Sequence, residues 1–214
     1  MLSELSDEEL FERFRRGEKP AFEALLRRHR APLFTFVLRT LGPNDRSRAE
    51  DVVQDTFVRV IKGAAEWQQK ARFITWLFTI ARNLCLDQMR RDKHRRADSL
   101  DAPETEEPGR PLGDTLNGTE AGPERQAAAA RLRPALEKAL ATLPPDQREV
   151  FVLREYSGLP FKEIAELQGI GENTVKSRMR YALESLRRTL SELGIDGDLA
   201  DDDAARPHAS GVTG

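Results

Sequence analysis

The segment from Phe73 to Arg96 joins an apolar half to a cationic half. Its first half carries large apolar side chains on almost every side of a helix, which predicts a helix surrounded by neighbours. Its second half gathers side chains that could bind phosphates, namely Arg90, Arg91, Lys93, His94, Arg95 and Arg96. Taken alone, the segment fits either a core helix with a solvated basic tip or a buried root that presents cations to a nucleic acid.

A second set of cations lies behind a glycine-containing turn near the C-terminal end. The sequence predicts a short helix at 161–168, a turn at 169–171 and a long helix at 172–193, the order of a helix-turn-helix. One side of the long helix is apolar, and Arg178 falls towards it. The opposite side carries donors and acceptors suited to base edges and phosphates: Asn173, Lys176, Ser177 and Arg180, flanked by Thr174 and Tyr181. This pattern predicts DNA binding.

A third candidate surface lies on the helix expected behind Ser47 and Glu50, which form a capping-box pattern. Apolar residues share one face of this helix: Ala49, Val52, Val53, Thr56, Phe57, Val60 and Ile61. The other side presents Asp51, Gln54, Asp55 and Val58 at i, i+3, i+4 and i+7. An exposed valine among two carboxylates and an amide could dock a basic partner, or it could be an ordinary solvated face. Spacing alone leaves both open.

The elements that must position these residues are all helical, and no strand pattern is found. The predicted fold is all-α, with two small helical domains at 1–96 and 125–194. Ser6 with Glu9 forms another capping-box pattern, which starts the first helix. Between the domains, 97–124 is rich in acids, proline and glycine, as is typical of a flexible linker. About 28 such residues could separate the domains by about 30 Å. The acidic tail at 195–214 is expected to be disordered.

Composition limits the classes of protein that remain. The chain has 214 residues, 33% of them charged, a mean hydropathy of −0.58 and a net charge of −2. No apolar run approaches the roughly 20 residues of a membrane span, so no membrane insertion is expected. The single cysteine, Cys85, lies in an apolar segment as a small buried hydrophobe and fits a reducing cytoplasm. The three histidines share no ligand spacing, so neither a metal nor another cofactor is expected.

Two alternatives stay open at this point. The chain could be a stand-alone helix-turn-helix regulator whose N-terminal domain senses a ligand or dimerises. It could also be a metal-dependent nuclease that uses carboxylates on two neighbouring helices: Glu50, Asp51, Asp55 and Asp87. The nuclease hypothesis is the weaker one, because nothing near these carboxylates supplies a general base.

Four segments resemble the extracytoplasmic-function (ECF) sigma factors, the compact branch of the bacterial sigma-70 family. They read AEDVVQDTFVRV at 49–60, TWLFTIARNLCLDQMRR at 75–91, LPPDQREVFVLREYSG at 143–158 and FKEIAELQGIGENTVKSRMRYALESLRR at 161–188. They stand in the family's order on both sides of an acidic linker, and the resemblance covers about 5–96 and 125–190. It implies a sigma-2-like helical bundle followed by a sigma-4-like helix-turn-helix domain.

The resemblance also implies a function, which is to bind core RNA polymerase, direct it to promoters and open the DNA without catalysing a reaction. Asp51, Gln54, Asp55 and Val58 would dock on the β′ clamp helices, and the C-terminal domain on the β flap. The loop at 63–72 would set −10 specificity. The −10 region would be bound by Asn83, Arg90, Arg91, Lys93, Arg95 and Arg96, with Asn83 near the pocket for a flipped base.

In the C-terminal domain the resemblance assigns Asn173, Thr174, Lys176, Ser177, Arg180 and Tyr181 to the −35 region. Tyr181 stands where many members carry arginine, so the family's −35 sequence cannot be transferred. Gly171 replaces a frequent serine, but glycine is an acceptable helix cap. An anti-sigma factor is a further partner that the family leads one to expect. The promoter and the activating signal are not encoded in any recognisable motif.

Overall fold

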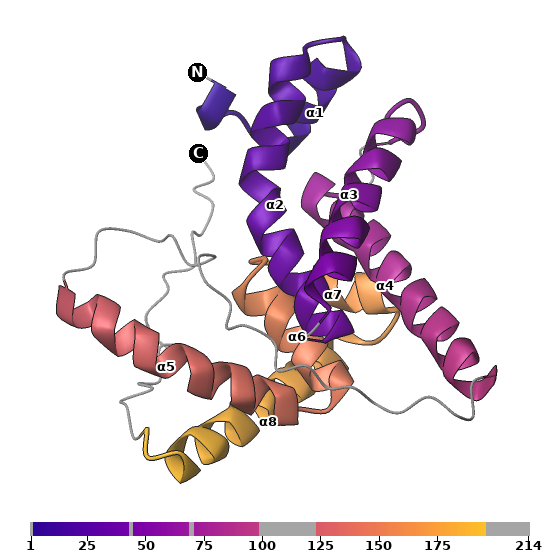
Figure 1. Ribbon diagram of the computed structural model, residues 1–214. Helices are drawn as coiled ribbons and strands as arrows, with labels where there is room; N and C mark the ends of the chain where they lie inside the picture. Colours follow the sequence, from indigo (N-terminus) through magenta and orange to yellow (C-terminus); the bar gives the residue numbers. More distant parts are fainter. Residues whose placement is uncertain (1, 43–44, 69–70, 99–122, 196–214) are drawn as a thin grey trace.

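The computed structural model describes residues 2–42, 45–68, 71–98 and 123–195. The regular secondary structure in these ranges is entirely helical, which confirms the all-α prediction. A short 3₁₀ turn at Leu2–Glu4 precedes α1 (Asp7–Arg15), α2 (Lys19–Leu41), α3 (Arg46–Lys62), α4 (Phe73–Asp98), α5 (Pro123–Thr142), α6 (Pro145–Glu155), α7 (Phe161–Gln168) and α8 (Glu172–Glu192). Figure 1 shows α1 to α4 on one side of the molecule and α5, α6 and α8 on the other, with α7 between them.

The N-terminal half is built from α1 to α4. Helices α2, α3 and α4 pack on one another around a buried apolar core, and α1 lies on α2 and α4. Aromatic rings fill the junction between α1 and the start of α4. The centroid of the Phe11 ring lies 5.0 Å from that of Phe73, 5.1 Å from Trp67 and 5.5 Å from Trp76. Trp76 therefore serves packing within this half.

The two capping boxes that the sequence predicted have different outcomes. At the start of α1 the hydroxyl of Ser6 accepts a hydrogen bond from the Glu9 N–H at 3.2 Å, and the Glu9 carboxylate accepts one from the Ser6 N–H at 2.8 Å. That prediction is confirmed. The Ser47–Glu50 box is wrong, because α3 already begins at Arg46 and Ser47 lies inside its first turn. Glu50 instead pairs with Arg46 at 3.3 Å.

Helix α1 is fastened to the bundle by two carboxylates. Glu8 accepts a hydrogen bond from the backbone N–H of Phe73 at 2.9 Å, at the point where α4 begins. Asp7 contacts the guanidinium of Arg28 at 2.5 Å and the imidazole of buried His29 at 2.8 Å. Burial would raise the pKa of Asp7, but hydrogen bonds and charge attraction from His29 and Arg28 outweigh it and lower that pKa.

The C-terminal half is the predicted helix-turn-helix with two supporting helices. Helix α8 packs on α5, α6 and α7. The turn between α7 and α8 contains Gly169, whose φ of 69° is the left-handed conformation that glycine adopts without strain. Gly171 caps α8 in an extended conformation. The observed bounds of α7 and α8 agree with the sequence prediction to within one residue.

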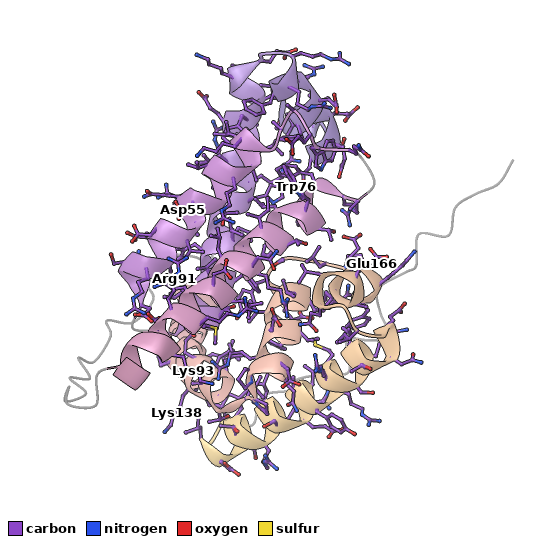
Figure 2. The ribbon with its side chains drawn as sticks, turned by 90° about the vertical axis from the view of Figure 1, so that its right-hand side faces the viewer. Asp55, Trp76, Arg91, Lys93, Lys138 and Glu166 are labelled. Carbon is purple, nitrogen blue, oxygen red and sulfur yellow. The ribbon has the colours of Figure 1, made fainter. Side chains whose placement is uncertain are left out.

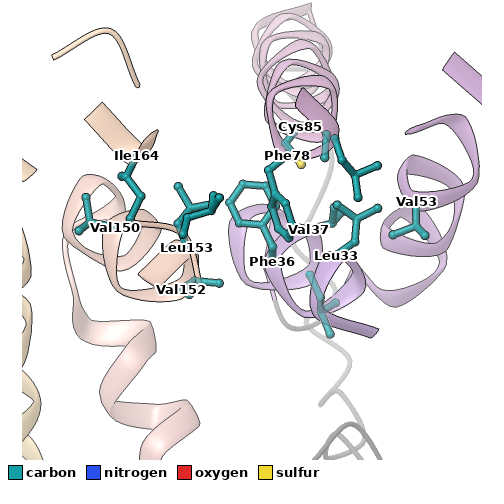
Figure 3. Close-up of a cluster of buried hydrophobic side chains, with 14 of the residues drawn as sticks. Leu33, Phe36, Val37, Val53, Phe78, Cys85, Val150, Val152, Leu153 and Ile164 are labelled. Atoms are coloured by element: carbon teal, nitrogen blue, oxygen red, sulfur yellow. The ribbon is translucent and has the colours of Figure 1, made fainter. Parts of the chain in front are cut away.

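The two halves pack against each other, although the linker is long enough to separate them. Helix α6 contacts α2, and α7 contacts α4. Figure 3 shows Val152 and Leu153 of α6 facing Phe36 of α2 and Phe78 of α4, and these buried side chains belong to one continuous apolar cluster. The 99–122 part of the predicted linker lies outside the described residues, and the predicted domain boundaries stay predictions.

The Asp7 contacts predict a stability that depends on pH. Because the pKa of Asp7 is lowered on folding, its contribution is complete at neutral pH and is lost as the pH falls below about 4. Asp7→Asn should reduce the free energy of unfolding at pH 7 by about 1–3 kcal/mol, and the deficit should shrink towards pH 3. Urea unfolding at both pH values measures this, with Glu23→Gln on the exposed side of α2 as the control. An equal deficit at both pH values would contradict the assignment.

Candidate nucleic-acid interface

Helix α8 separates its buried and exposed sides as the sequence predicted. Val175, Met179, Ala182, Leu186 and Leu190 are buried against α5, α6 and α7. The six residues assigned to the −35 region are all exposed: Asn173, Thr174, Lys176, Ser177, Arg180 and Tyr181. The guanidinium of Arg180 lies 5.0 Å from the centroid of the Tyr181 ring. Tyr181 therefore supports the neighbouring cation through a cation–π contact.

Arg178 fixes α8 to the rest of its domain. Its guanidinium contacts Asp146 of α6 at 3.1 Å and the amide oxygen of Gln168, at the end of α7, at 3.3 Å. Arg178 thus holds the first helix of the helix-turn-helix and a supporting helix to the second. This confirms that Arg178 does not belong to the exposed face.

The cationic end of α4 is exposed as far as its side chains are described. Asn83, Arg90, Arg91 and Lys93 are accessible, and Arg90 lies 3.3 Å from Asp87, the pairing that the spacing predicted. The side chains of His94, Arg95 and Arg96 lie outside the described part of the structure. At about 100° per residue, Asn83 and Arg90 lie close together on the face of α4 that points away from its buried side.

Helix α3 presents its polar side chains outwards. Asp51, Gln54, Asp55 and Val58 are exposed, with 44% of Val58 accessible. Figure 2 shows Asp55 of α3 and Arg91 of α4 on the outer edge of the molecule. The sequence placed Ile61 on the buried side, but it is 46% exposed, one turn beyond Val58. Ile61 was missed because α3 ends at Lys62, where its neighbours no longer cover it.

A groove between α2 and α3 adjoins this surface. It has a volume of about 710 Å³, and Leu26 and Phe34 of α2 face Val53 and Gln54 of α3 across it. The guanidinium of Arg46 covers one end, 5.3 Å from the Phe34 ring centroid. The exposed side of α3 therefore combines carboxylates with accessible apolar surface, a composition that suits a protein partner better than DNA.

Nothing in the described structure favours the nuclease hypothesis. The residues described contain no cluster of three or more histidine, cysteine or acidic side chains suited to a metal ion. Burial and the nearby carboxylate of Glu149 raise the pKa of the Cys85 thiol to about 12, so this cysteine is a protonated core residue, as expected. Among the helices described, none is long and apolar enough to cross a membrane.

The three predicted surfaces are not brought together into one site. They lie on α3, the far end of α4 and α8, which are separate faces of two packed halves (Figures 1 and 2). Each is a convex surface on a helix, and none encloses a small molecule. An arrangement of this kind can bind large partners along several faces at once.

Comparison with known proteins agrees with this reading. Residues 25–95 match the family model described as Sigma-70 region 2, and residues 133–186 match Sigma-70, region 4. The chain is 36% identical to RNA polymerase sigma factor CarQ of Myxococcus xanthus, over 86% of this chain and 98% of that protein. It is 37% identical to ECF RNA polymerase sigma factor SigL of Mycobacterium tuberculosis, over 84% of this chain and 94% of the relative.

Solved structures give the same answer for the fold. The sigma factor RpoE from Bartonella quintana, in complex with the anti-sigma factor NepR, is similar with a TM-score of 0.63 and 27% identity, over 82% of this chain and 98% of that one. CnrH, in complex with the cytosolic domain of CnrY, is similar with a TM-score of 0.58 and 25% identity, over 89% and 99%.

Fold and exposed recognition helix together define a two-part transcription initiation factor of the helix-turn-helix class. The chain belongs to the sigma-70 family, within its ECF sigma factors.

The contrast between Arg178 and Arg180 predicts different effects on stability. Arg178→Ala should reduce the free energy of unfolding by about 1 kcal/mol, a modest value because its ion pair with Asp146 is partly exposed. Arg180→Ala is the matched control, since Arg180 is exposed and lies 3.8 Å from Glu184 of its own helix. Urea denaturation followed by circular dichroism measures both. Equal losses would mean that Arg178 does not hold α8 in place.

Proposed function

We propose that this ECF sigma factor binds core RNA polymerase, directs it to specific promoters through their −10 and −35 elements, and opens the DNA. The observation that carries this proposal is the match of both halves to sigma-70 regions, combined with exposure of the predicted contact residues on α3, α4 and α8. The work is done by binding alone, and we infer that the protein is not an enzyme. Its partners place it in the bacterial cytoplasm.

Helix α3 is the proposed polymerase-docking element. Asp51, Gln54, Asp55 and Val58 would meet the β′ clamp helices, and exposed Ile61 extends the same surface. Carboxylates at its edge would favour basic residues on the polymerase, while Val58 and Ile61 would lose apolar surface to water only in the complex. The C-terminal domain would make a second contact, with the β flap.

The end of α4 is the proposed −10 element. Opening a duplex costs about 1.4 kcal/mol of stacking per base-pair step. A flipped base regains about 1–3 kcal/mol when a protein surface takes it up. Asn83 is placed to hold such a base, and Arg90, Arg91, Lys93, Arg95 and Arg96 would neutralise the phosphates beside it. These gains balance the cost without nucleotide hydrolysis.

Regulation by an anti-sigma factor is the last part of the proposal. Two similar solved structures contain sigma factors bound to NepR and to the cytosolic domain of CnrY. By analogy, a partner that covers the exposed side of α3 would prevent polymerase docking.

Run-off transcription tests the proposed function directly. Core polymerase with this protein should transcribe a subset of fragments from a genomic library, and the start sites would reveal the promoter. Core polymerase alone is the control. Sequence-specific binding of the isolated protein, without polymerase-dependent transcripts, would instead favour a stand-alone helix-turn-helix regulator.

The docking surface predicts the effect of a double substitution. Asp51→Ala with Gln54→Ala should weaken binding to core polymerase at least tenfold without changing the helical content, because both side chains are exposed. Glu155→Ala with Glu192→Ala, both exposed in the C-terminal half, is the control. Affinity measured by fluorescence anisotropy decides, and an unchanged value would remove α3 from the interface.

The recognition helix predicts a base-dependent loss. Arg180→Ala should cost about 1–3 kcal/mol on the cognate −35 sequence and much less on −35 variants, if Arg180 reads a base edge. Binding of the holoenzyme to a panel of −35 variants measures this. A loss that is equal for every sequence would limit Arg180 to phosphate contact.

A further inference from the structure

The two halves are joined by polar contacts of uniform direction. Glu163 of α7 accepts a hydrogen bond from the hydroxyl of Thr75 and lies 3.2 Å from the guanidinium of Arg72. Glu149 of α6 accepts a hydrogen bond from Nε of Arg82 at 2.7 Å. In these contacts the donors belong to the N-terminal half and the carboxylates to the C-terminal half.

These donors lie beside the proposed −10 surface. Thr75 and Arg82 are seven residues apart and therefore share one side of α4, and Asn83 lies about 100° further round the same helix. Arg72 stands just before α4 begins, at the end of the predicted specificity loop. DNA that reaches Asn83 would pass these three side chains.

We propose that Arg72, Thr75 and Arg82 bind backbone phosphates of the parted DNA strand, and that Glu163 and Glu149 occupy those phosphate positions while the halves are packed. A guanidinium and a hydroxyl offer the same donors to a carboxylate as to a phosphate oxygen. Each donor serves one anion at a time, so packing of the halves and binding of the strand exclude each other. This inference rests on the proposed function.

The packed arrangement also contains a feature that favours its release. Arg39 of α2 is 91% buried between the halves, where its guanidinium lies 3.9 Å from the Tyr156 ring centroid and pairs with Glu137. Its Nε and Nη1 find no hydrogen-bond partner among the described residues. Leaving such donors dry and unpaired costs free energy, which is recovered when the halves part and water reaches Arg39.

Neutralising the two carboxylates in the full-length protein tests the exclusion. Glu149→Gln with Glu163→Gln should lengthen the distance between spin labels at Lys62→Cys and Arg188→Cys, while buried Cys85 stays unlabelled. The same variant should bind a fluorescein-labelled 12-nucleotide single-stranded DNA of mixed sequence at least threefold more tightly. Glu155→Gln with Glu192→Gln makes the same charge change away from these contacts and should alter neither value. An unchanged distance and affinity would overturn the inference.

A second variant tests the phosphate contacts themselves. Adding Arg72→Gln and Arg82→Gln to the neutralised protein should reduce the slope of log affinity against log salt by about 0.7 for each lost contact. Arg27→Gln with Arg30→Gln, two exposed cations of α2, is the control and should leave the slope unchanged. An unchanged slope after loss of Arg72 and Arg82 would overturn the assignment. Failure of the proposed function would appear separately, as absence of polymerase-dependent transcription by the wild-type protein.

Discussion

Burial of the first half of α4 is the constraint on which the other features depend. Phe73, Leu77, Phe78 and Leu84 are held by the surrounding helices, and Glu8 of α1 fixes the backbone where α4 begins. A helix held in this way cannot rotate without exposing its apolar side chains. Its remaining sides therefore have fixed directions: one carries Asn83 and Arg90, and the next carries Thr75 and Arg82. Recognition of DNA by α4 follows from packing that never touches DNA.

The same constraint explains why the functional surfaces are separate. Polymerase docking uses the outer side of α3, strand separation the exposed side of α4, and −35 reading the exposed side of α8. Each helix has one side committed to a core and one left for a partner. The chain therefore makes no enclosed site, and the active arrangement of the three surfaces has to be completed by polymerase and promoter together.

Periodicity in the sequence predicted the helix faces well and the helix ends less well. The division of α8 into buried Val175 and Met179 and exposed Lys176 and Arg180 was correct, because a long amphipathic helix has only one way to bury its apolar side. The errors occur at the two ends of α3. Local cap patterns there competed with a start one residue earlier, and the exposure of Ile61 depends on where neighbouring helices stop.

Residue types and spacing by themselves determined the all-α fold, the helix-turn-helix, the exposed residues of α3 and α8 and membership of the sigma-70 family. They could do so because these properties are local, repeating every turn of a helix. Only the tertiary structure decided that Glu149 meets Arg82 and that Glu163 meets Thr75 and Arg72, contacts that join residues 67 to 91 positions apart. No periodicity encodes such pairs. They depend on how two separately folded surfaces fit together, and here that fit places carboxylates where DNA phosphates are expected.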